Sequence, residues 1–446
     1  MFCFKFPTFN GMKKETPDLN NSKILTIIVV AALGYFVDIY DLVLFGVVKA
    51  ESLKQIMIGT SPELQAATGK FLFNMQMIGM LIGGVIWGVL GDKKGRLTVL
   101  FGSILLYSLA NIANAIVYDI NSYAVIRIVA GIGLAGELGA GITLVSEMMS
   151  KEKRGYGTMI IVTFGALGAV FASLVGSKGE FFSQLIYQAT AVKLANWQVA
   201  YLIGGIMGFI LLFLRIGTIE SSYFNSIKSN KEIVKGSFKL LFTSKTNRKK
   251  YLYCIIIGIP IWYIIGLIIM NSKDDFGPWL GLKNIENGKA VMYAYLGLSF
   301  GDLISGFLSQ LLKSRKKVVF LYLSFTGILT LVFLFFGKGM TASNYYFFCF
   351  LLGTGTGYWA IFVTIAAEQF GTNIRSTAAN TIPNFVRGSV NLIMLLFSIL
   401  LASQLSVGIS AFLIGALFIG LAFYSLSQLK ETFAKDLDYI EKQTTK

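Results

Sequence analysis

The stretch Gly88-Val-Leu-Gly-Asp-Lys-Lys-Gly-Arg96 separates two apolar segments, 70–91 and 97–118. Each segment is long enough to cross the hydrocarbon core of a bilayer as a helix. The stretch therefore predicts a short charged turn at a membrane surface, between two membrane-spanning helices. The same alternation of long apolar segments and short polar loops continues in both directions along the chain.

Twelve apolar segments of spanning length are predicted. They cover residues 24–48, 70–91, 97–118, 122–148, 156–176, 198–217, 251–270, 289–312, 317–337, 343–367, 378–402 and 408–427. With 55% hydrophobic and 14% charged residues, the chain has too few charges to cover a soluble protein of its size. We therefore expect an all-α integral membrane protein with twelve transmembrane helices.

The distribution of basic residues predicts the orientation of these helices. An even number of spans places both termini on one side, and that side carries roughly 27 Lys and Arg residues against roughly 9 on the other. The positive-inside rule therefore predicts cytoplasmic termini in a multi-pass plasma-membrane protein, and the richness in Lys, Asn and Ile points to a bacterial inner membrane. Because the basic residues lie in short loops, the net charge of +16 indicates topology rather than a nucleic-acid partner.

An internal repeat divides the chain into two halves. Four residues recur at one constant offset, Gly79, Gly83, Gly88 and Leu90 as Gly297, Gly301, Gly306 and Leu308. The expected organisation is a cytoplasmic N-terminal tail (1–23), a six-helix bundle (24–217), a basic cytoplasmic linker (218–250), a second six-helix bundle (251–427) and a cytoplasmic C-terminal tail (428–446). Two pseudo-symmetric bundles of this kind are expected to rock about a central site.

The second copy of the charged turn has changed. At the same offset, Gln310 stands where Asp92 stands, Lys313 where Gly95 stands and Ser314 where Arg96 stands. The contacts made by the two turns are therefore expected to be unequal.

Ionisable side chains near the bilayer centre are costly unless they are paired, hydrated or neutralised, so each is a candidate functional residue. The first predicted helix contains Asp38 near mid-depth and Asp41 nearly one turn further on. Two carboxyl groups this close do not both ionise easily in a dry site, which suits a proton carrier. Tyr40, between them, is a candidate for contact with a substrate.

The fourth predicted helix adds Glu137 at mid-depth and Arg127 nearer the outside. The chain has no histidine, so any coupled proton must be carried by a carboxyl group, with Asp38, Asp41 and Glu137 as the candidates. Polar packing in a pore wall is the alternative role of Glu137. Arg127 is a candidate substrate-binding residue.

In the second half, Asp302 lies near the middle of the eighth predicted helix and Arg387 near the middle of the eleventh. A guanidinium at this depth either binds a substrate carboxylate or forms a structural ion pair, for which Asp302 is the expected partner. A substrate that competes for Arg387 would make that pair a switch. Tyr358 and Trp359 of the tenth helix either stack on a ligand or pack against neighbouring helices.

The charged turn has the form G-x-x-x-D-K-x-G-R, which resembles the signature loop between the second and third helices of the major facilitator superfamily of secondary transporters. The resemblance implies a cytoplasmic gate, in which the acidic residue of the loop contacts neighbouring helix ends and holds the outward-facing state closed. Glu147 with Arg154, and Glu368 with Arg375, occupy equivalent positions in the two halves and are expected in the same gate, with plain surface ion pairs as the alternative. The candidate gate residues are Gly88, Asp92, Lys93, Gly95, Arg96, Glu147, Arg154, Glu368 and Arg375.

Two further patterns resemble one branch of that superfamily, the metabolite:proton symporters. They are G-x-x-x-D/E-x-Y-D-x-x-x-F/Y-G in the first helix and R-x-x-x-G-x-G-x-x-G-E-x-G in the fourth. Members of the branch import organic acids and zwitterions with protons, so the resemblance implies import of a small polar metabolite by proton symport through alternating access. The chain departs from the branch at Asp38, where glutamate is usual, and at Ile39, where an aromatic residue is usual.

Other functions stay open at this point. In an amino-acid carrier, the membrane carboxylates would hold the ammonium group of the substrate instead of a proton, and a sensor would keep the fold without transport. Sodium could replace the proton as the coupling ion. The sequence contains no nucleophile–base pair, metal cluster or cofactor motif, so an enzyme, a metal site and a cofactor are not expected. The expected partners are a small-molecule substrate, protons and membrane lipid, and a monomer suffices.

Overall fold

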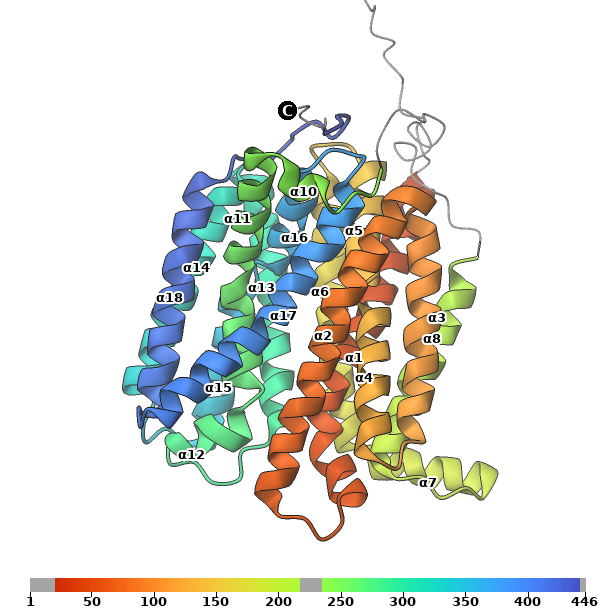
Figure 1. Cartoon of the computed structure of the whole chain (residues 1–446), viewed down its shortest axis with the longest axis vertical. Coiled ribbons are helices and arrows are strands. Elements are labelled where there is room, and N and C mark those ends of the chain that lie inside the picture. The colour runs from red at the N-terminus through yellow and green to blue at the C-terminus, as the bar shows by residue number, and fades with distance from the viewer. Residues whose placement is uncertain (1–20, 217–234, 442–446) are drawn as a thin grey trace, which may run out of the picture.

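A computed structural model describes residues 21–216 and 235–441 (Figure 1). The predicted N-terminal tail up to residue 20, the predicted linker as far as residue 234 and the end of the predicted C-terminal tail (442–446) lie outside the described residues. Within the described ranges every regular element is a helix, and twelve helices are long and apolar enough to cross a membrane. The twelve spans predicted from the sequence are thus confirmed.

The first half contains six spans and one further short helix. These elements are α1 (Asn21–Ile56), α2 (Pro62–Lys94), α3 (Arg96–Ala115), α4 (Ile120–Leu134), α5 (Glu137–Met148), α6 (Arg154–Ser177), α7 (Gly179–Thr190) and α8 (Asn196–Leu214). Helices α4 and α5 together form the fourth span.

The second half repeats this order of spans. Its elements are α10 (Leu240–Thr243), α11 (Lys245–Trp262), the π-helices η1 (Tyr263–Ile269) and η2 (Ser272–Phe276), α12 (Gly277–Trp279), α13 (Asn287–Leu311), α14 (Arg315–Phe336), α15 (Ala342–Thr356), α16 (Trp359–Glu368), α17 (Arg375–Ala402) and α18 (Val407–Gln428). Helix α11 begins inside the predicted linker, and α15 and α16 together form the tenth span.

Two spans are interrupted at equivalent places in the two halves, between α4 and α5 and between α15 and α16. The second interruption coincides with a close approach of two backbones, since a Cβ atom on Gly357 would lie 2.4 Å from Cα of Gly301 in α13. Only glycine fits at such a contact. Interrupted helices place polar helix ends near the middle of the membrane, where transporters bind their substrates.

The seventh span ends in π-helical turns. The backbone N–H of Met270 donates to Ile265 O at 3.0 Å, and that of Phe276 donates to Asn271 O at 3.2 Å. Hydrogen bonds that reach five residues back widen the helix, and such turns are frequent at functional sites.

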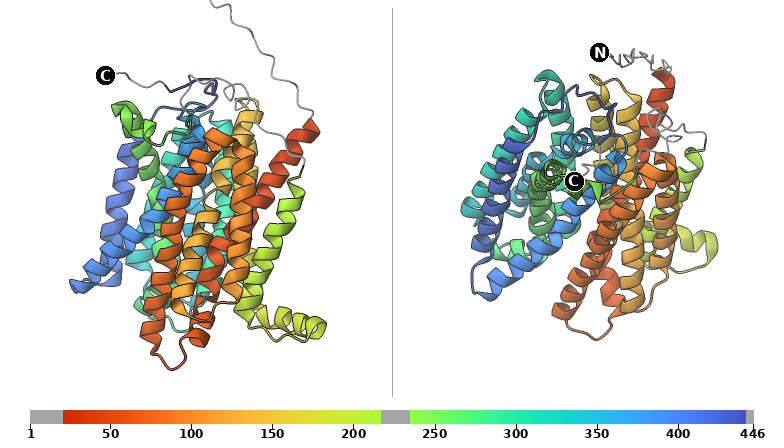
Figure 2. Two further views of the ribbon diagram at one scale, coloured as in Figure 1. Left: turned by 45° about the vertical axis from the view of Figure 1, so that its right-hand side comes forward. Right: turned by 45° about the horizontal axis from the view of Figure 1, so that its top comes forward.

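The two halves lie side by side (Figure 2). Helix α2 packs against α17, and α6 packs against α13. We call the end at the top of Figure 1 the upper end; it holds the turn between α2 and α3 and the C-terminal segment, defined as residues 429–441. The other end, which holds the loop between α1 and α2 together with α12, is the lower end.

Helix α7 lies across the lower end and projects to the side of the bundle (Figure 1). It exposes Phe181, Leu185 and Tyr187. Exposed apolar side chains on a short helix beside a bundle of spans are typical of a helix in the membrane interface. The sequence analysis missed α7 because the helix is too short to appear as a spanning segment.

Candidate functional site

A buried ion pair joins the two halves near the middle of the bundle. The Arg387 Nη2 atom in α17 lies 3.5 Å from Oδ2 of Asp38 in α1. Both side chains are buried, and among the described residues neither oxygen of Asp38 has a hydrogen-bond partner. The expectation that Arg387 pairs with Asp302 was wrong for this structure: α1 of the opposite half supplies the carboxylate.

Tyr35 and Trp359 complete this contact between the halves. The Tyr35 hydroxyl accepts hydrogen bonds from Trp359 Nε1 at 2.8 Å and from Arg387 Nη2 at 3.3 Å. The Arg387 guanidinium also lies over the Trp359 ring, 5.6 Å from its centroid. Tyr35 is one helical turn before Asp38, so both side chains project from the same face of α1.

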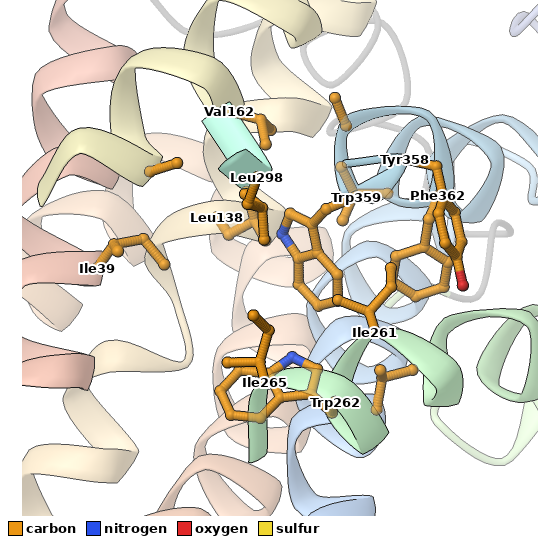
Figure 3. Close-up of a cluster of buried hydrophobic side chains, with 14 of the residues drawn as sticks. Ile39, Leu138, Val162, Ile261, Trp262, Ile265, Leu298, Tyr358, Trp359 and Phe362 are labelled. Atoms are coloured by element: carbon orange, nitrogen blue, oxygen red, sulfur yellow. The ribbon is translucent and has the colours of Figure 1, made fainter. Parts of the chain in front are cut away.

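A small cavity of about 20 Å³ lies at this contact, between the two halves. Its walls are aromatic and aliphatic apart from the tyrosine hydroxyls and Arg387. The lining residues are Tyr35, Ile39, Ala166, Ile261, Trp262, Ile265, Tyr295, Leu298, Trp359 and Arg387. Figure 3 shows Trp262 and Trp359 among apolar side chains of both halves. Trp359 was predicted beside the cavity, whereas Tyr35 and Trp262 were not singled out.

Asp41 lies inside the first half, away from the residues that line the central cavity. Its carboxyl group fills a notch opposite Gly204 of α8, where a Cβ atom would lie 2.4 Å from Asp41 Oδ1. The side chain is buried, and among the described residues neither oxygen has a hydrogen-bond partner.

Glu137, the third predicted proton carrier, forms an ion pair instead. Arg215, at the end of α8, donates to both carboxylate oxygens, with 3.0 Å between Arg215 Nη1 and Glu137 Oε2. Gly34 of α1 leaves room for the pair, because a Cβ atom there would overlap both side chains. Two hydrogen bonds from one guanidinium fix the position of the Glu137 carboxyl group, which argues for its structural role. The sequence analysis missed Arg215 because it stands at the end of a predicted span.

Asp302 stabilises the interrupted tenth span. Its Oδ1 atom accepts a hydrogen bond from the backbone N–H of Ala360 at 2.8 Å, in the first turn of α16. A carboxyl oxygen at this position satisfies a backbone N–H of the first helical turn that has no partner within the helix. Asp302 therefore acts on the position of Trp359, the first residue of α16, and not directly on Arg387.

The other three predicted substrate residues also point elsewhere. The hydroxyl of Tyr40 donates to Ala200 O at 2.8 Å within the first half, and that of Tyr358 donates to Ile257 O at 2.9 Å within the second. Arg127 donates to Gln76 and, at 3.4 Å, to the hydroxyl of Tyr201. These side chains link helices within one half and do not line the central cavity.

Replacement of Asp302 by Ala is expected to loosen the first turn of α16 and so the placement of Trp359. The loss of a helix-capping side chain costs about 1 to 2 kcal/mol. We expect a lower melting temperature and faster hydrogen exchange of the Ala360 backbone N–H, both measured on purified protein. Asp302→Asn, which keeps an oxygen acceptor, should recover most of both. Equal defects in the Ala and Asn variants would show that the charge of Asp302, and not its capping bond, is required.

At the upper end, Asp92 of α2 caps a helix of the opposite half. Its carboxylate accepts hydrogen bonds from the backbone N–H groups of Ser376 (3.0 Å) and Thr377 (2.8 Å), in the first turn of α17. It also accepts one from the Thr377 hydroxyl at 2.6 Å. Gly88, one turn earlier, allows this approach, since a Cβ atom there would lie 2.9 Å from Thr377 Cα.

The second-half counterpart of Asp92 behaves differently. Gln310 lies against Gly155 near the start of α6, and a Cβ atom on Gly155 would overlap its amide nitrogen. A neutral amide replaces the capping carboxylate at this contact, so the two turns make unequal contacts, as expected. Of the other residues of the first turn, Gly95 has a φ of 109°, which favours glycine, and Lys93 is exposed.

Two buried glutamates link the halves at the upper end. Glu147 pairs with Arg96 of its own half (2.9 Å) and with Arg375 of the other half (2.7 Å). Glu368 pairs correspondingly with Arg315 (2.8 Å) and, across the interface, with Arg154 (3.1 Å). The predicted residues are therefore together, but each glutamate pairs with the arginine of the opposite half. These are buried pairs and not surface pairs.

Arg315 is the arginine of the second charged turn. A constant offset aligned Ser314 with Arg96 and suggested that the second turn had lost its arginine. The structure shows that Arg315, one position later, makes the contact with Glu368 that Arg96 makes with Glu147. The second turn has therefore lost the acidic residue and the glycine of the first turn but has kept its arginine.

The C-terminal segment lies over these pairs at the upper end. The carbonyl oxygen of Lys435 accepts a hydrogen bond from Arg154 of the first half, and that of Leu437 accepts one from Arg375 of the second. Glu441 pairs with Lys250 at 3.0 Å. The segment thus bridges the two halves at the predicted gate, which sequence motifs did not indicate.

The docking of this segment is expected to depend on pH through Lys435. Burial, together with the nearby charge of Lys250, lowers the pKa of Lys435 to about 8. Arg375 adds repulsion, whereas Glu441 and Glu368 attract the ammonium group. Below pH 8 the ammonium group is charged in both the docked and the undocked segment, so the cost of its burial is constant. Above pH 8 the docked amine is neutral, and the cost falls as the pH approaches 10.5, the ordinary pKa of the undocked lysine. Docking should therefore tighten as the pH rises from about 8 to about 10.

A nitroxide spin label at exposed Asp436 measures this effect. We expect its mobility in the electron paramagnetic resonance spectrum to fall between about pH 8 and about pH 10. Lys435→Arg is the control, because a guanidinium stays charged over this range. The same pH response in that variant would assign the effect to another group.

The sequence comparison decides the family of this chain. The sequence model of the family described as the Major Facilitator Superfamily matches residues 31–382. The chain belongs to the Major Facilitator Superfamily. It is a multi-pass membrane transporter of small organic molecules, and not an enzyme.

Among its relatives, the chain is 24% identical to the niacin transporter NiaP of Acinetobacter baylyi, over 79% of this chain and 82% of the relative. It is 25% identical to the 3-(3-hydroxy-phenyl)propionate transporter of Escherichia coli, over 83% and 85% of the two chains. The gentisate transporter of Corynebacterium glutamicum is 23% identical over 90% and 88%.

The fold is also that of a solved superfamily transporter. The structure of the proton:xylose symporter XylE matches with a TM-score of 0.74 and 16% sequence identity, over 94% of this chain and 98% of XylE. The likeness supports the arrangement of two six-helix bundles.

Proposed function

We propose that this transporter imports an aromatic monocarboxylate together with a proton. The observation that carries the proposal is the ion pair between Arg387 and Asp38, which sits between the two halves beside Tyr35 and Trp359. Niacin, hydroxyphenylpropionate and gentisate, named for three relatives, share an aromatic ring and a carboxylate, and this cavity offers a cation beside aromatic walls.

Arg387 can bind the carboxylate of an acid in this site. A guanidinium binds a carboxylate by two parallel hydrogen bonds, and aromatic walls accept a flat ring by stacking. The cavity of about 20 Å³ is too small for such a ligand, so binding requires the halves to move apart. Arg387 would then exchange Asp38 for the carboxylate of the substrate.

This exchange would couple the acid to a proton. Once the substrate occupies Arg387, Asp38 is left buried without a counter-ion, and a buried unpaired carboxylate is costly. Asp38 then takes up a proton. One acid anion and one proton enter the site together, and the transport cycle is electroneutral. Asp41, buried in the same helix, is the second proposed proton carrier.

The proposed orientation places the upper end in the cytoplasm, as the positive-inside rule requires. The contacts of Asp92, Glu147 and Glu368 between the halves then form a closed cytoplasmic gate. Release of the acid into the cell requires these contacts to separate. One chain contains the whole proposed site, so the proposal needs no partner subunit.

An amino-acid carrier is less well supported by this geometry. Such a carrier needs a carboxylate to hold the substrate ammonium group, but Asp38 is paired with Arg387 and Glu137 with Arg215. Asp41 lies among residues of the first half and does not line the central cavity. The proposal therefore favours acids over zwitterions.

Uptake into liposomes tests the proposal. Purified protein is reconstituted with a pH dye inside and offered labelled nicotinate, benzoate and 3-phenylpropionate, with proline and phenylalanine as zwitterionic controls. We expect accumulation of at least one acid when the outside is acidic, accompanied by internal acidification. Preference for the amino acids, or accumulation driven by sodium without a pH change, would contradict the proposal.

A further inference from the structure

A second and larger cavity lies at the lower end, between the two halves. Its volume is about 560 Å³. Helices α1, α2 and α6 line it from the first half, and η2 with the start of α13 lines it from the second. We call this cavity the vestibule.

The vestibule lies on the line that leads to the central cavity. Lys49 and Gly46 of α1 line both the vestibule and a narrow gap next to it. This gap extends along η1 to Gly266 and Met270. Asp38 is 11 residues before Lys49 in the same helix, or about 16 Å along its axis. The vestibule is therefore separate from the Arg387 site.

Two ion pairs join the halves at the lower end. Lys49 lies 3.5 Å from Asp274, and Lys70 lies 3.3 Å from Asp275. Both aspartates belong to η2, so a movement of this one π-helical turn can separate both pairs. Of the two pairs, only Lys49 and Asp274 line the vestibule.

The charges that line the vestibule favour an anion. Its lining includes three lysines and two acids. Lys49 is paired with Asp274, and Lys289 with Glu286. Among the described residues, the ammonium group of Lys273 has no hydrogen bond or ion pair. The distance of 3.5 Å between Lys49 Nζ and Asp274 Oδ2 is also longer than that of a tight charge-assisted hydrogen bond, which is about 2.7 to 2.9 Å. Another anion can therefore replace Asp274 at Lys49.

We propose that the vestibule is a docking site for the carboxylate of the incoming substrate, which displaces Asp274 from Lys49 and so loosens the contact between α1 and η2. Lys273 supplies the second positive charge. The inference rests on the proposed import of an acid, and it adds a binding step before Arg387. The class of ligand is a small monocarboxylate anion.

Charge substitutions separate docking from simple gating. Lys49→Gln removes the docking cation and should raise the KM for acid uptake about tenfold, whereas Asp274→Asn removes the competitor and should lower KM. If the pair were only a gate, both variants would break the same ion pair and shift KM in the same direction. The opposite shifts are therefore the result expected for a docking site.

The second ion pair is the matched control. Lys70→Gln and Asp275→Asn break a pair that lies outside the vestibule lining, so both should shift KM in one direction. A shift of Lys49→Gln and Asp274→Asn in one direction, like that of the control pair, would overturn the proposal.

A chemical readout keeps this test independent of transport. Lys49 and Lys273 are labelled with an amine-reactive reagent, with and without benzoate, and the label at each lysine is quantified by mass spectrometry. Benzoate should protect both lysines in the wild-type protein and equally in Arg387→Gln, which lacks the proposed central site. Absence of protection in both proteins contradicts docking, even where the wild type transports the acid. Protection without any transport of acids would instead leave docking in place and reject the proposed import.

Discussion

Arg387→Gln should abolish accumulation of the acid, with a fall in the initial rate of uptake of about 30-fold or more. Loss of one partner from a buried charged pair costs about 2 to 5 kcal/mol, which corresponds to this range. The glutamine would remove the fork that binds the substrate carboxylate and would leave Asp38 without its counter-ion. The rate is measured with labelled acid in liposomes at matched protein content.

Arg387→Lys provides the control for charge. Lysine keeps the positive charge but lacks the planar fork, so uptake should be intermediate between wild type and Arg387→Gln. Size-exclusion profiles and melting temperatures of both variants show whether the fold is retained. Wild-type uptake by well-folded Arg387→Gln would remove Arg387 from the substrate site.

Asp38→Asn should separate binding from coupling. Asparagine is close to aspartate in shape but cannot take up or release a proton, and it no longer competes as an anion for Arg387. The acid should therefore bind as tightly as before or more tightly. Its uptake should stop once its concentrations inside and outside the liposomes are equal. Exchange of labelled for unlabelled acid across the membrane should continue, because it needs no net movement of protons.

Asp41→Asn is the matched comparison for this variant. Asp41 lies in the same helix but does not line the central cavity, so its replacement should not alter competition at Arg387. A loss of accumulation in Asp41→Asn alone would move the coupling role from Asp38 to Asp41. Full proton-driven accumulation by Asp38→Asn would count strongly against the proposed cycle.

The twelve spans were predictable because apolar segments of spanning length follow directly from the thickness of the bilayer. The same criterion could not show where a span is interrupted. The breaks before α5 and α16 and the π-helices η1 and η2 depend on contacts with neighbouring helices, such as the backbone approach of Gly357 to Gly301. Apolar length and composition are unchanged by such contacts.

The ionisable residues of the site were also predictable, but their partners were not. Asp38 and Arg387 stand out because charges in apolar helices are costly. Which carboxylate faces Arg387 depends on the rotation of each helix and on the packing of one half against the other. Asp302 instead caps α16, and Arg215 pairs with Glu137. Tyr35 could have been found only from its position one helical turn before Asp38, which places both side chains on the same face of the helix.

The upper-end pairs show the same limit. Glu147, Arg154, Glu368 and Arg375 were recognised from their equal spacing in the two halves. Equal spacing cannot reveal that each glutamate bonds the arginine of the opposite half. Arg315 was missed because one extra residue breaks the constant offset of the repeat.

Proton uptake on binding tests the exchange at Arg387 most directly. Purified protein in a weakly buffered solution with a pH dye is mixed with the acid that the liposome assay identifies, and the protons taken up are compared with the acid bound. The account predicts about one proton taken up per acid anion by the wild type and none by Asp38→Asn. Binding of the acid by the wild type without proton uptake, or equal uptake by Asp38→Asn, would contradict the account.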